Sequence, residues 1–229
     1  MKNILITGHK GLIGSILIDG LKNDYNLYGI DCEEKCIDNF DMRFFNCDIV
    51  NNIDLKNTVQ QIYNRNEKID IIIHLAAEAR ENANWDSIYK NNIIGTKNIY
   101  DCAIDFGIKR IILASSTHIY SGYSQYPDKI TGDNYYKIKK DSFPKSNNLY
   151  GISKMFCENL ANHYYLTYGL ESIIIRIGSV SSDNKPHNPY HLLYLSHEDL
   201  INKFIAGIKT DHKLLTFFAI TITPTIFDI

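Results

Sequence analysis

The sequence predicts an α/β protein whose core is a parallel sheet covered by helices on both faces. Short apolar runs alternate with longer amphipathic segments along the chain. The runs are continuously apolar, which is typical of strands buried on both faces. A glycine-rich turn follows the first run directly and precedes the first amphipathic segment. Together these observations favour an open, doubly wound sheet.

Each element follows from its own stretch of sequence. Strands are predicted, in chain order, at 4–6, 27–30, 44–45, 69–75, 111–113 and 173–177, with a last one near 214–220. Helices are predicted at 11–23, 53–66, 86–106, 149–168 and 197–209. In the third and fourth helices, apolar or small residues recur near the 3.6-residue period of an amphipathic helix.

The turn after the first strand predicts a nucleotide site of the Rossmann type. Gly8, Gly11 and Gly14 lie between a strand and a helix, where glycine lets the backbone approach a pyrophosphate. The N-terminus of the helix then offers free N–H groups to the phosphates. Asp31 ends the second strand, and a carboxylate there accepts hydrogen bonds from the ribose hydroxyls and repels a 2′-phosphate. The motif therefore predicts NAD as the cofactor and disfavours NADP.

Two irregular stretches, 115–147 and 178–195, interrupt the strand–helix alternation, and such long stretches are usually functional. We expect residues 1–177 to form the NAD-binding Rossmann domain. Residues 178–229 would form a small, shortened substrate-side addition fused to it. A missing further helix would expose Phe217, Phe218 and Phe227 and lower the stability of the protein.

Composition narrows the class of protein. Of 229 residues, 45% are hydrophobic and 22% are charged, which is ordinary for a globular chain and excludes disorder. A formal net charge of -2 gives no basic field for nucleic acid or an anionic membrane. An odd number of cysteines, five, favours reduced thiols. The first residues do not resemble a signal peptide, and 214–222 is too short to span a bilayer. We expect a soluble, cytoplasmic protein.

Tyr150 and Lys154 are a candidate catalytic pair, because residues four apart share one face of a helix. A nearby ammonium stabilises a phenolate, which makes a tyrosine usable as an acid or base. Tyr135 and Tyr136 also precede a lysine by four residues, but they lie in the polar stretch rather than on the amphipathic helix. The spacing and its context together favour Tyr150.

With these motifs, the chain resembles the extended short-chain dehydrogenase/reductase family, the NAD-dependent epimerase/dehydratase group. Further motifs follow in family order over essentially the whole chain to about residue 220: Asp48-Ile49, His74-Leu75-Ala76-Ala77, Asn92 to Thr96, and Leu113 to Tyr120. The resemblance implies that NAD contacts Leu12, Ile13, Asp48, Ile49, Leu75, Ala76, Ala77 and Asn92, besides the glycines, Asp31, Tyr150 and Lys154. Asn92 would be structural or part of the active site.

Within the family, the segments Ala114 to His118, 150–160, 176–179 and 196–200 are most similar to those of uronate dehydrogenases. Nucleotide-sugar epimerases commonly have Asn at the position of Ser179, so this difference disfavours an epimerase. The resemblance implies that Tyr150 takes a proton from the sugar hydroxyl, that Ser116 orients this hydroxyl, and that Lys154 binds the nicotinamide ribose. Thr117, His118 and Arg176 would lie on the substrate side. Arg176 would either face the site or pair structurally.

The implied function is that of an NAD-dependent sugar dehydrogenase acting on an aldose or a uronate. Two alternatives stay open: a nucleotide-sugar epimerase or dehydratase that retains its NAD, and a family member that binds NAD without catalysis. The family implies a homodimer through the helices at 86–106 and 149–168. No metal site is expected, because prolines surround His187 and His191, and Cys32 and Cys36 have no second pair.

One departure from the family pattern concerns the sugar. Uronate dehydrogenases hold the sugar carboxylate with an arginine in the loop after the segment that matches 176–179. Here residues 178–195 offer Lys185, His187 and His191 but no arginine. Since a guanidinium pairs with a carboxylate through two parallel hydrogen bonds, its absence predicts weak uronate oxidation.

Overall fold

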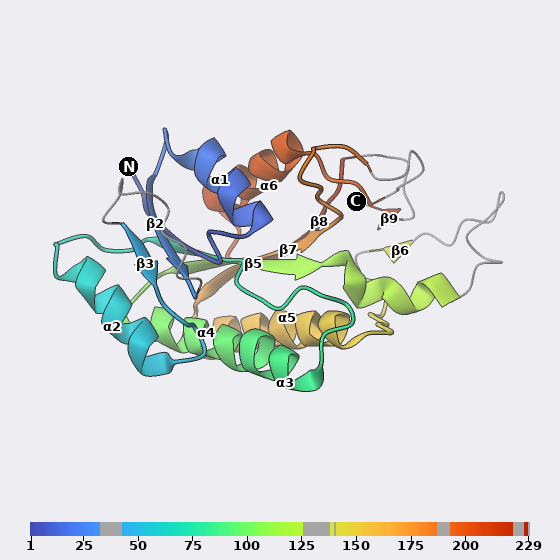
Figure 1. Cartoon of the computed structure of the whole chain (residues 1–229), viewed down its shortest axis with the longest axis horizontal. Coiled ribbons are helices and arrows are strands. Elements are labelled where there is room, and N and C mark those ends of the chain that lie inside the picture. Colours follow the sequence, from blue (N-terminus) through green and yellow to red (C-terminus); the bar gives the residue numbers. More distant parts are fainter. Residues whose placement is uncertain (33–42, 126–137, 140, 187–192, 222–226, 229) are drawn as a thin grey trace.

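The computed structural model describes residues 1–32, 43–125, 138–139, 141–186, 193–221 and 227–228. Within this part of the chain, seven strands form one parallel sheet in the order β3-β2-β1-β4-β5-β7-β8 (Figure 1). The strands are β1 (Asn3–Thr7), β2 (Asn26–Asp31), β3 (Phe44–Asn46), β4 (Ile71–His74), β5 (Arg110–Ser116), β7 (Glu171–Ile177) and β8 (Leu214–Ala219). The predicted doubly wound α/β fold is confirmed.

Helices cover both faces of the sheet. They are α1 (Leu12–Leu21), α2 (Asn52–Tyr63), α3 (Trp85–Ile88), α4 (Gly95–Asp105), α5 (Leu149–Tyr168) and α6 (His197–Lys209). Figure 1 shows α1 and α6 on one face, and α2, α4 and α5 on the other. A separate short pair joins β6 (Ile138–Lys139) to β9 (Phe227–Asp228).

The apolar strand residues supply a hydrophobic core on each side of the sheet. On β4, the side chain of Ile72 packs in the core beneath α2, α4 and α5. The neighbouring Ile71 and Ile73 pack in the core beneath α1 and α6. Successive side chains of a strand point to opposite faces, so a strand covered on both sides must be apolar throughout. This explains the continuous apolar runs.

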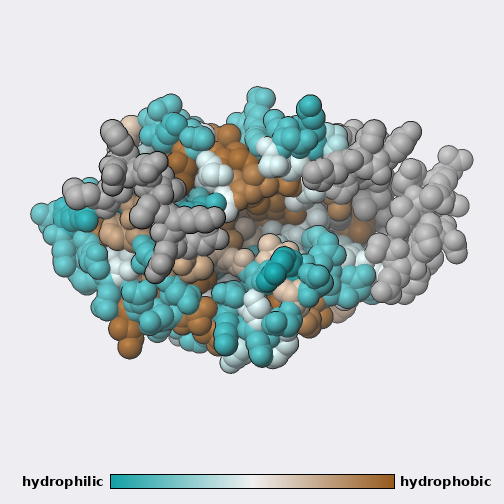
Figure 2. Space-filling model, viewed as in Figure 1, coloured by the Kyte–Doolittle hydropathy of each residue, from teal (hydrophilic) through white to brown (hydrophobic). Residues whose placement is uncertain are grey.

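The direction of strand order reverses between β1 and β4, because β2 and β3 lie on one side of β1 and β5 lies beyond β4. Thr7 at the end of β1 is paired with His74 at the end of β4. In open α/β sheets, the crevice outside the carboxyl ends of the strands at such a reversal is where ligands bind. Figure 2 shows apolar side chains gathered in a hollow on this face of the molecule.

Two predicted segments differ in detail from the structure. The helix expected at 86–106 consists of α3, then a π-helix η1 (Tyr89–Ile94), and then α4. The irregular stretch expected from 115 begins with the end of β5 and with η2 (Thr117–Gln125), a 3₁₀-helix. Neither a π-turn nor a 3₁₀-helix has a strong periodic signal in a sequence.

The expected exposure of Phe218 is wrong, since this side chain is 1% exposed. β8 pairs with β7 along its full length, and the Phe218 ring packs against Tyr120 with 5.8 Å between ring centroids. Phe217 is half-buried, and the side chain of Phe227 lies outside the described residues. The C-terminal segment adds α6 and β8 to the same core and sheet, and the domain boundary at 177 stays a prediction. No described helix is both long and apolar enough to cross a membrane.

Candidate active site

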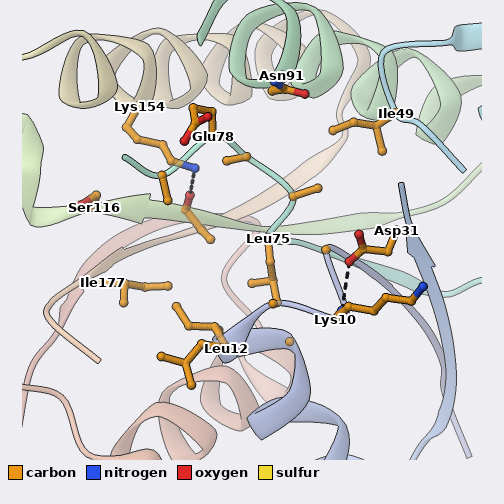
Figure 3. Close-up of a pocket in the computed structure, with 18 of the residues that line it drawn as sticks. Lys10, Leu12, Asp31, Ile49, Leu75, Glu78, Asn91, Ser116, Lys154 and Ile177 are labelled. Atoms are coloured by element: carbon orange, nitrogen blue, oxygen red, sulfur yellow. Dashed lines mark hydrogen bonds between the residues drawn. The ribbon is translucent and has the colours of Figure 1, made fainter. Parts of the chain in front are cut away.

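A pocket of about 680 Å³ opens at the carboxyl ends of the central strands, where the strand order reverses (Figure 3). Most of the predicted site residues line it: Gly8, Gly11, Leu12, Ile13, Gly14, Asp31, Asp48, Ile49, Leu75, Ala76, Ala77, Ser116, His118, Tyr150 and Lys154. Three predicted residues, Asn92, Thr117 and Arg176, are not among the lining residues. The structure therefore brings the nucleotide motif and the candidate catalytic groups to one cavity.

The glycine-rich loop fits a nucleotide diphosphate. Gly8 has a φ of +72°, a left-handed conformation that favours glycine, and a Cβ on it would lie 2.8 Å from the backbone nitrogen of Ala76. The helix α1 begins at Leu12 directly after the loop, and no side chain caps its N-terminus. Its first N–H groups and its dipole are therefore available to phosphate oxygens.

Asp31 lies at the end of β2, on the rim of the same pocket (Figure 3). Its Oδ2 accepts a hydrogen bond of 3.0 Å from the backbone N–H of Lys10, which ties the carboxylate to the glycine-rich loop. A carboxylate in this position suits the two hydroxyls of an adenosine ribose.

A buried histidine joins the ends of β1 and β4. The Thr7 Oγ1 accepts hydrogen bonds from the backbone N–H groups of Leu75 and Ala76 and lies 2.7 Å from His74 Nδ1. The Thr7 hydroxyl proton therefore points to Nδ1, and Nε2 carries the imidazole proton, which it donates to Thr96 Oγ1 at 3.0 Å. Burial, followed by the charge of Lys154, lowers the pKa of His74 to about 3. A neutral His74 thus holds the strand ends that form the floor of the pocket.

The two candidate catalytic elements are β5, which ends at Ser116, and α5, which begins at Leu149. The Asn148 side chain caps α5 by accepting a hydrogen bond of 2.8 Å from the backbone N–H of Gly151. A Cβ on Gly151 would lie 2.9 Å from the carbonyl carbon of His118, so this glycine lets α5 pack closely on η2. This contact fixes Tyr150 beside the segment that follows Ser116.

The polar atoms of Ser116 and Lys154 each have a backbone partner in the described part of the chain. Ser116 Oγ accepts a hydrogen bond of 3.1 Å from the backbone N–H of His118, which leaves its own proton for a ligand. The ammonium of Lys154 is buried, donates a hydrogen bond of 2.8 Å to the carbonyl of Ala114, and lies 5.7 Å from the centroid of the Tyr150 ring. Two of its three N–H bonds are left for other acceptors.

Arg176, expected either to face the site or to pair structurally, is bound to a carboxylate of α5. Its guanidinium binds the carboxylate of Glu158 through two hydrogen bonds of 3.0 and 2.8 Å, and donates a third, of 2.7 Å, to the Tyr120 hydroxyl. Both ion-pair partners are buried. The structure therefore shows the structural pairing, between Arg176 and Glu158. Tyr120 is also buried, and burial raises its pKa to about 12.

Asn92 and Thr117 are buried beside the pocket. The Asn92 amide accepts a hydrogen bond from the backbone N–H of Glu78 and donates one to its carbonyl, at 2.7 and 2.9 Å. It also donates to Ser153 Oγ at 2.8 Å. Asn92 therefore joins the loop after β4 to α5.

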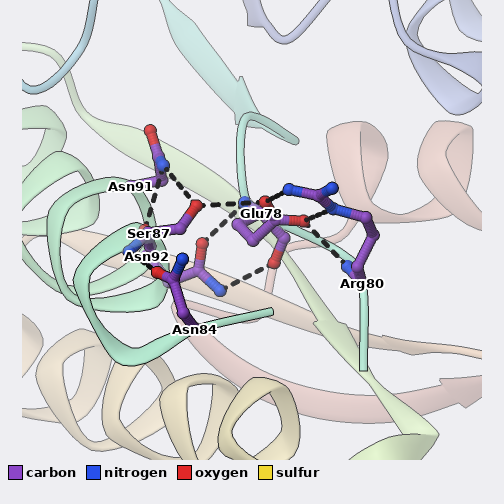
Figure 4. Close-up of polar contacts among 6 residues, drawn as sticks. All are labelled: Glu78, Arg80, Asn84, Ser87, Asn91 and Asn92. Carbon is purple, nitrogen blue, oxygen red and sulfur yellow. Dashed lines mark hydrogen bonds and ion pairs between the residues drawn. The ribbon is translucent and has the colours of Figure 1, made fainter. Parts of the chain in front are cut away.

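Glu78 and Asn91 line the pocket, although the sequence did not single them out (Figures 3 and 4). The Glu78 carboxylate accepts hydrogen bonds from the side chain and backbone of Arg80 and from Ser87 Oγ. The Arg80 hydrogen bonds are the main reason that the pKa of Glu78 falls to about 2. Asn91 lies in the π-helix η1, and its amide nitrogen donates to Ser87. A single sequence contains no signal for this π-turn, which is why both residues were missed.

Metal ligands were not expected, and the described residues contain no cluster of three or more His, Cys, Asp or Glu side chains. His187, His191 and Cys36 lie outside the described residues.

Comparisons with known proteins agree with this site. The model of the NAD dependent epimerase/dehydratase family matches residues 4–217. An NAD-dependent glucose-6-phosphate dehydrogenase of Haloferax volcanii is 26% identical over 95% of this chain and 84% of its own length. An L-arabinose 1-dehydrogenase (NAD(P)(+)) of the same organism is 30% identical over 78% of this chain and 67% of its own.

Solved structures of uronate dehydrogenases also resemble this chain. The uronate dehydrogenase of Agrobacterium tumefaciens, solved as a mutant complexed with NAD, is 26% identical and superimposes with a TM-score of 0.82, over all of this chain and 80% of that one. A family model that matches most of the chain, on a fold with the nucleotide site in its expected place, decides the assignment. The chain belongs to the NAD-dependent epimerase/dehydratase family, and it is an NAD-dependent enzyme of the extended short-chain dehydrogenase/reductase type.

Proposed function

We propose that the protein oxidises a sugar, an aldose or a uronate, by transferring a hydride from a sugar C–H to NAD⁺. The observation that carries this proposal is the convergence of Ser116, Tyr150 and Lys154 in the same pocket as the glycine-rich loop and Asp31. A hydride acceptor and an acid–base group that share one cavity are what the oxidation of an alcohol needs.

Each chain residue has a distinct part in this reaction. The bound NAD⁺ supplies the hydride acceptor. The Tyr150 phenolate takes the proton of the sugar hydroxyl, while the free proton of Ser116 is donated to the same oxygen and orients it. The Lys154 ammonium binds the nicotinamide ribose with the N–H bonds that Ala114 does not use.

The choice of sugar rests on the relatives. Those named above act, by their names, on glucose 6-phosphate, L-arabinose or a uronate. A uronate dehydrogenase of Pseudomonas putida is also 37% identical over 63% of this chain and 50% of its own length. These names share one reaction class, the oxidation of a monosaccharide, and they support a sugar dehydrogenase over a nucleotide-sugar epimerase.

The test is to incubate the protein with NAD⁺ and a panel of aldoses, uronates, sugar phosphates and nucleotide sugars, and to follow NADH absorbance. Net NADH with a monosaccharide is the expected result. Interconversion of a nucleotide sugar without net NADH would establish an epimerase instead, and NAD binding with no sugar converted would establish a family member without catalysis.

We also propose a homodimer that forms through α3, η1, α4 and α5. Exposed apolar side chains on these elements, Trp85, Tyr89, Ile152 and Phe156, support this arrangement. Light scattering at micromolar concentration should give twice the chain mass, and a monomer would exclude the dimer.

We further propose that the protein is located in the reducing cytoplasm. The free, buried cysteines at 47, 102 and 157 support this location.

A further inference from the structure

His118 contacts both Ser116 and Tyr150 at the candidate active site. It lines the pocket, and its backbone N–H holds Ser116 Oγ. Its ring meets the Tyr150 ring edge-on, with 5.5 Å between the centroids. The position of the imidazole is therefore fixed relative to both groups.

The two ring nitrogens of His118 lie in different surroundings. Nε2 lies 3.6 Å from Oε1 of Glu81, a residue whose side chain is 65% exposed. Nδ1 is buried, and no described residue forms a hydrogen bond with it. A carboxylate beside one nitrogen favours a proton on that nitrogen, which leaves the lone pair on the other. The Glu81 carboxylate thus favours a buried Nδ1 that is ready to accept a proton.

The proposed oxidation requires such an acceptor. Each turnover moves one hydride to NAD⁺ and one proton to the Tyr150 phenolate, so Tyr150 must lose this proton before the next turnover. The Lys154 ammonium, which donates to the carbonyl of Ala114 and lies 5.7 Å from the centroid of the Tyr150 ring, has no lone pair with which to accept a proton. His118 is the imidazole that the described lining residues place beside Tyr150.

We propose that His118, oriented by Glu81, is a proton relay that returns Tyr150 to its phenolate form. The proton passes from the Tyr150 hydroxyl to Nδ1, directly or through one water, and an imidazolium forms beside the Glu81 carboxylate. The Nε2 proton then passes to Glu81 or to water outside the pocket. No electron moves in these steps, and the inference rests on the proposed sugar oxidation.

The first test compares kcat, followed as NADH, in the wild type, His118→Gln and Glu81→Gln, with His163→Gln as the matched control. His163 is an exposed histidine on the same helix as Tyr150, and its ring contacts Thr167. The relay predicts that His118→Gln lowers kcat by about tenfold or more, while NADH binding, read by fluorescence, stays within twofold. Added imidazole should restore part of the lost rate in His118→Gln and leave the other proteins unchanged.

The second test is the pH profile of kcat. In the described part of the chain, the titratable groups that face His118 are Tyr150 on α5 and Glu81 in the loop after β4. Glu81→Gln removes the carboxylate that faces Nε2, and with it the group that orients the ring and accepts its proton. The pH profile of Glu81→Gln should therefore differ from that of the wild type, and this variant folds because Glu81 is at the surface.

These outcomes separate the relay from the function on which it rests. If none of the sugars in the panel supports NAD⁺ reduction by the wild type, the proposed function and the relay are both wrong. If the wild type is active but His118→Gln keeps its kcat within twofold, or loses it without imidazole rescue, the relay alone is wrong. A pH profile of Glu81→Gln identical to that of the wild type would likewise exclude Glu81 from the relay.

Discussion

Glu158 and Arg176 form a buried, two-pronged ion pair, with 3.0 Å between Oε1 and Nε and 2.8 Å between Oε2 and Nη2. Glu158 lies one helical turn after Lys154 on α5, and its Oε1 also accepts the hydroxyl proton of Ser115 on β5. Arg176 is on β7. A single carboxylate thus fastens the helix that carries Tyr150 and Lys154 to the strand that carries Ser116.

Arg176→Met should strongly destabilise the protein. The substitution keeps an unbranched chain but leaves the buried Glu158 carboxylate without its counter-charge, which costs about 3–5 kcal/mol. The control is Lys22→Met, which removes an ion pair with Asp19 in which both side chains are more than half exposed, and which should change stability by about 1 kcal/mol or less. Urea unfolding measures both, and equal small losses would show that the pair is not important for folding.

Tyr150→Phe should remove turnover and leave NAD binding almost unchanged. The hydroxyl is needed for proton transfer, and the loss of a general acid or base lowers a rate by about 10²- to 10⁴-fold. Since the ring keeps its contact with His118, the fold is retained. Steady-state kinetics and NADH fluorescence titration measure the two effects, and a parallel loss of both would make Tyr150 a structural residue.

Asp31→Ala should weaken NAD binding by about tenfold or more, because hydrogen bonds to a charged group are each worth about 1.5–3 kcal/mol. It should also relax the discrimination against NADP, since the carboxylate that repels a 2′-phosphate is gone. Asp70→Ala, at the amino end of β4 and away from the pocket, is the control. Titrations with NADH and NADPH measure the two affinities, and an unchanged ratio of affinities would place Asp31 outside the ribose site.

The sequence predicts those parts of the site that depend on backbone geometry and on spacing within one element. Gly8 and Asp31 follow from the strand–turn–helix pattern, and Tyr150 and Lys154 follow from a four-residue spacing on one helix. The partners of Arg176 do not follow in this way. Whether this guanidinium faces the pocket or Glu158 is decided by how α5 packs on β7, and a linear sequence does not contain that packing.

Glu78 lines the pocket, but the sequence does not predict it as a site residue. Its carboxylate reaches the pocket because Asn92 hydrogen-bonds to its backbone and Arg80 hydrogen-bonds to its side chain. The Asn92 contact depends on the π-turn in η1. A π-turn shifts the helical register by one residue, which periodicity does not reveal.

The stability of the protein should fall with pH between about 6.5 and 3 because of His74. Its pKa is lowered from the ordinary histidine value of 6.5 to about 3 in the folded protein, so in this range the unfolded chain binds a proton that the folded one does not. This stability is fully present above pH 6.5 and is lost as the pH falls. His74→Gln should reduce the slope of unfolding free energy against pH by up to about 1.4 kcal/mol per pH unit. Identical slopes in urea titrations of the two proteins would contradict this.

Uronates should be poorer substrates than neutral aldoses of the same ring configuration. A bidentate guanidinium is the usual partner of a sugar carboxylate, yet residues 178–195 contain no arginine, and Arg176 is already bound to Glu158. The pocket itself is lined by the carboxylate of Glu78, whose pKa of about 2 keeps it ionised at any working pH. The measurement compares kcat/KM for galactose with galacturonate, and for glucose with glucuronate, with NAD⁺ saturating. We expect the neutral sugar of each pair to have the higher value. Robust uronate turnover with KM below about 1 mM would contradict the prediction and would make Lys185 or a histidine of that loop the partner of the carboxylate.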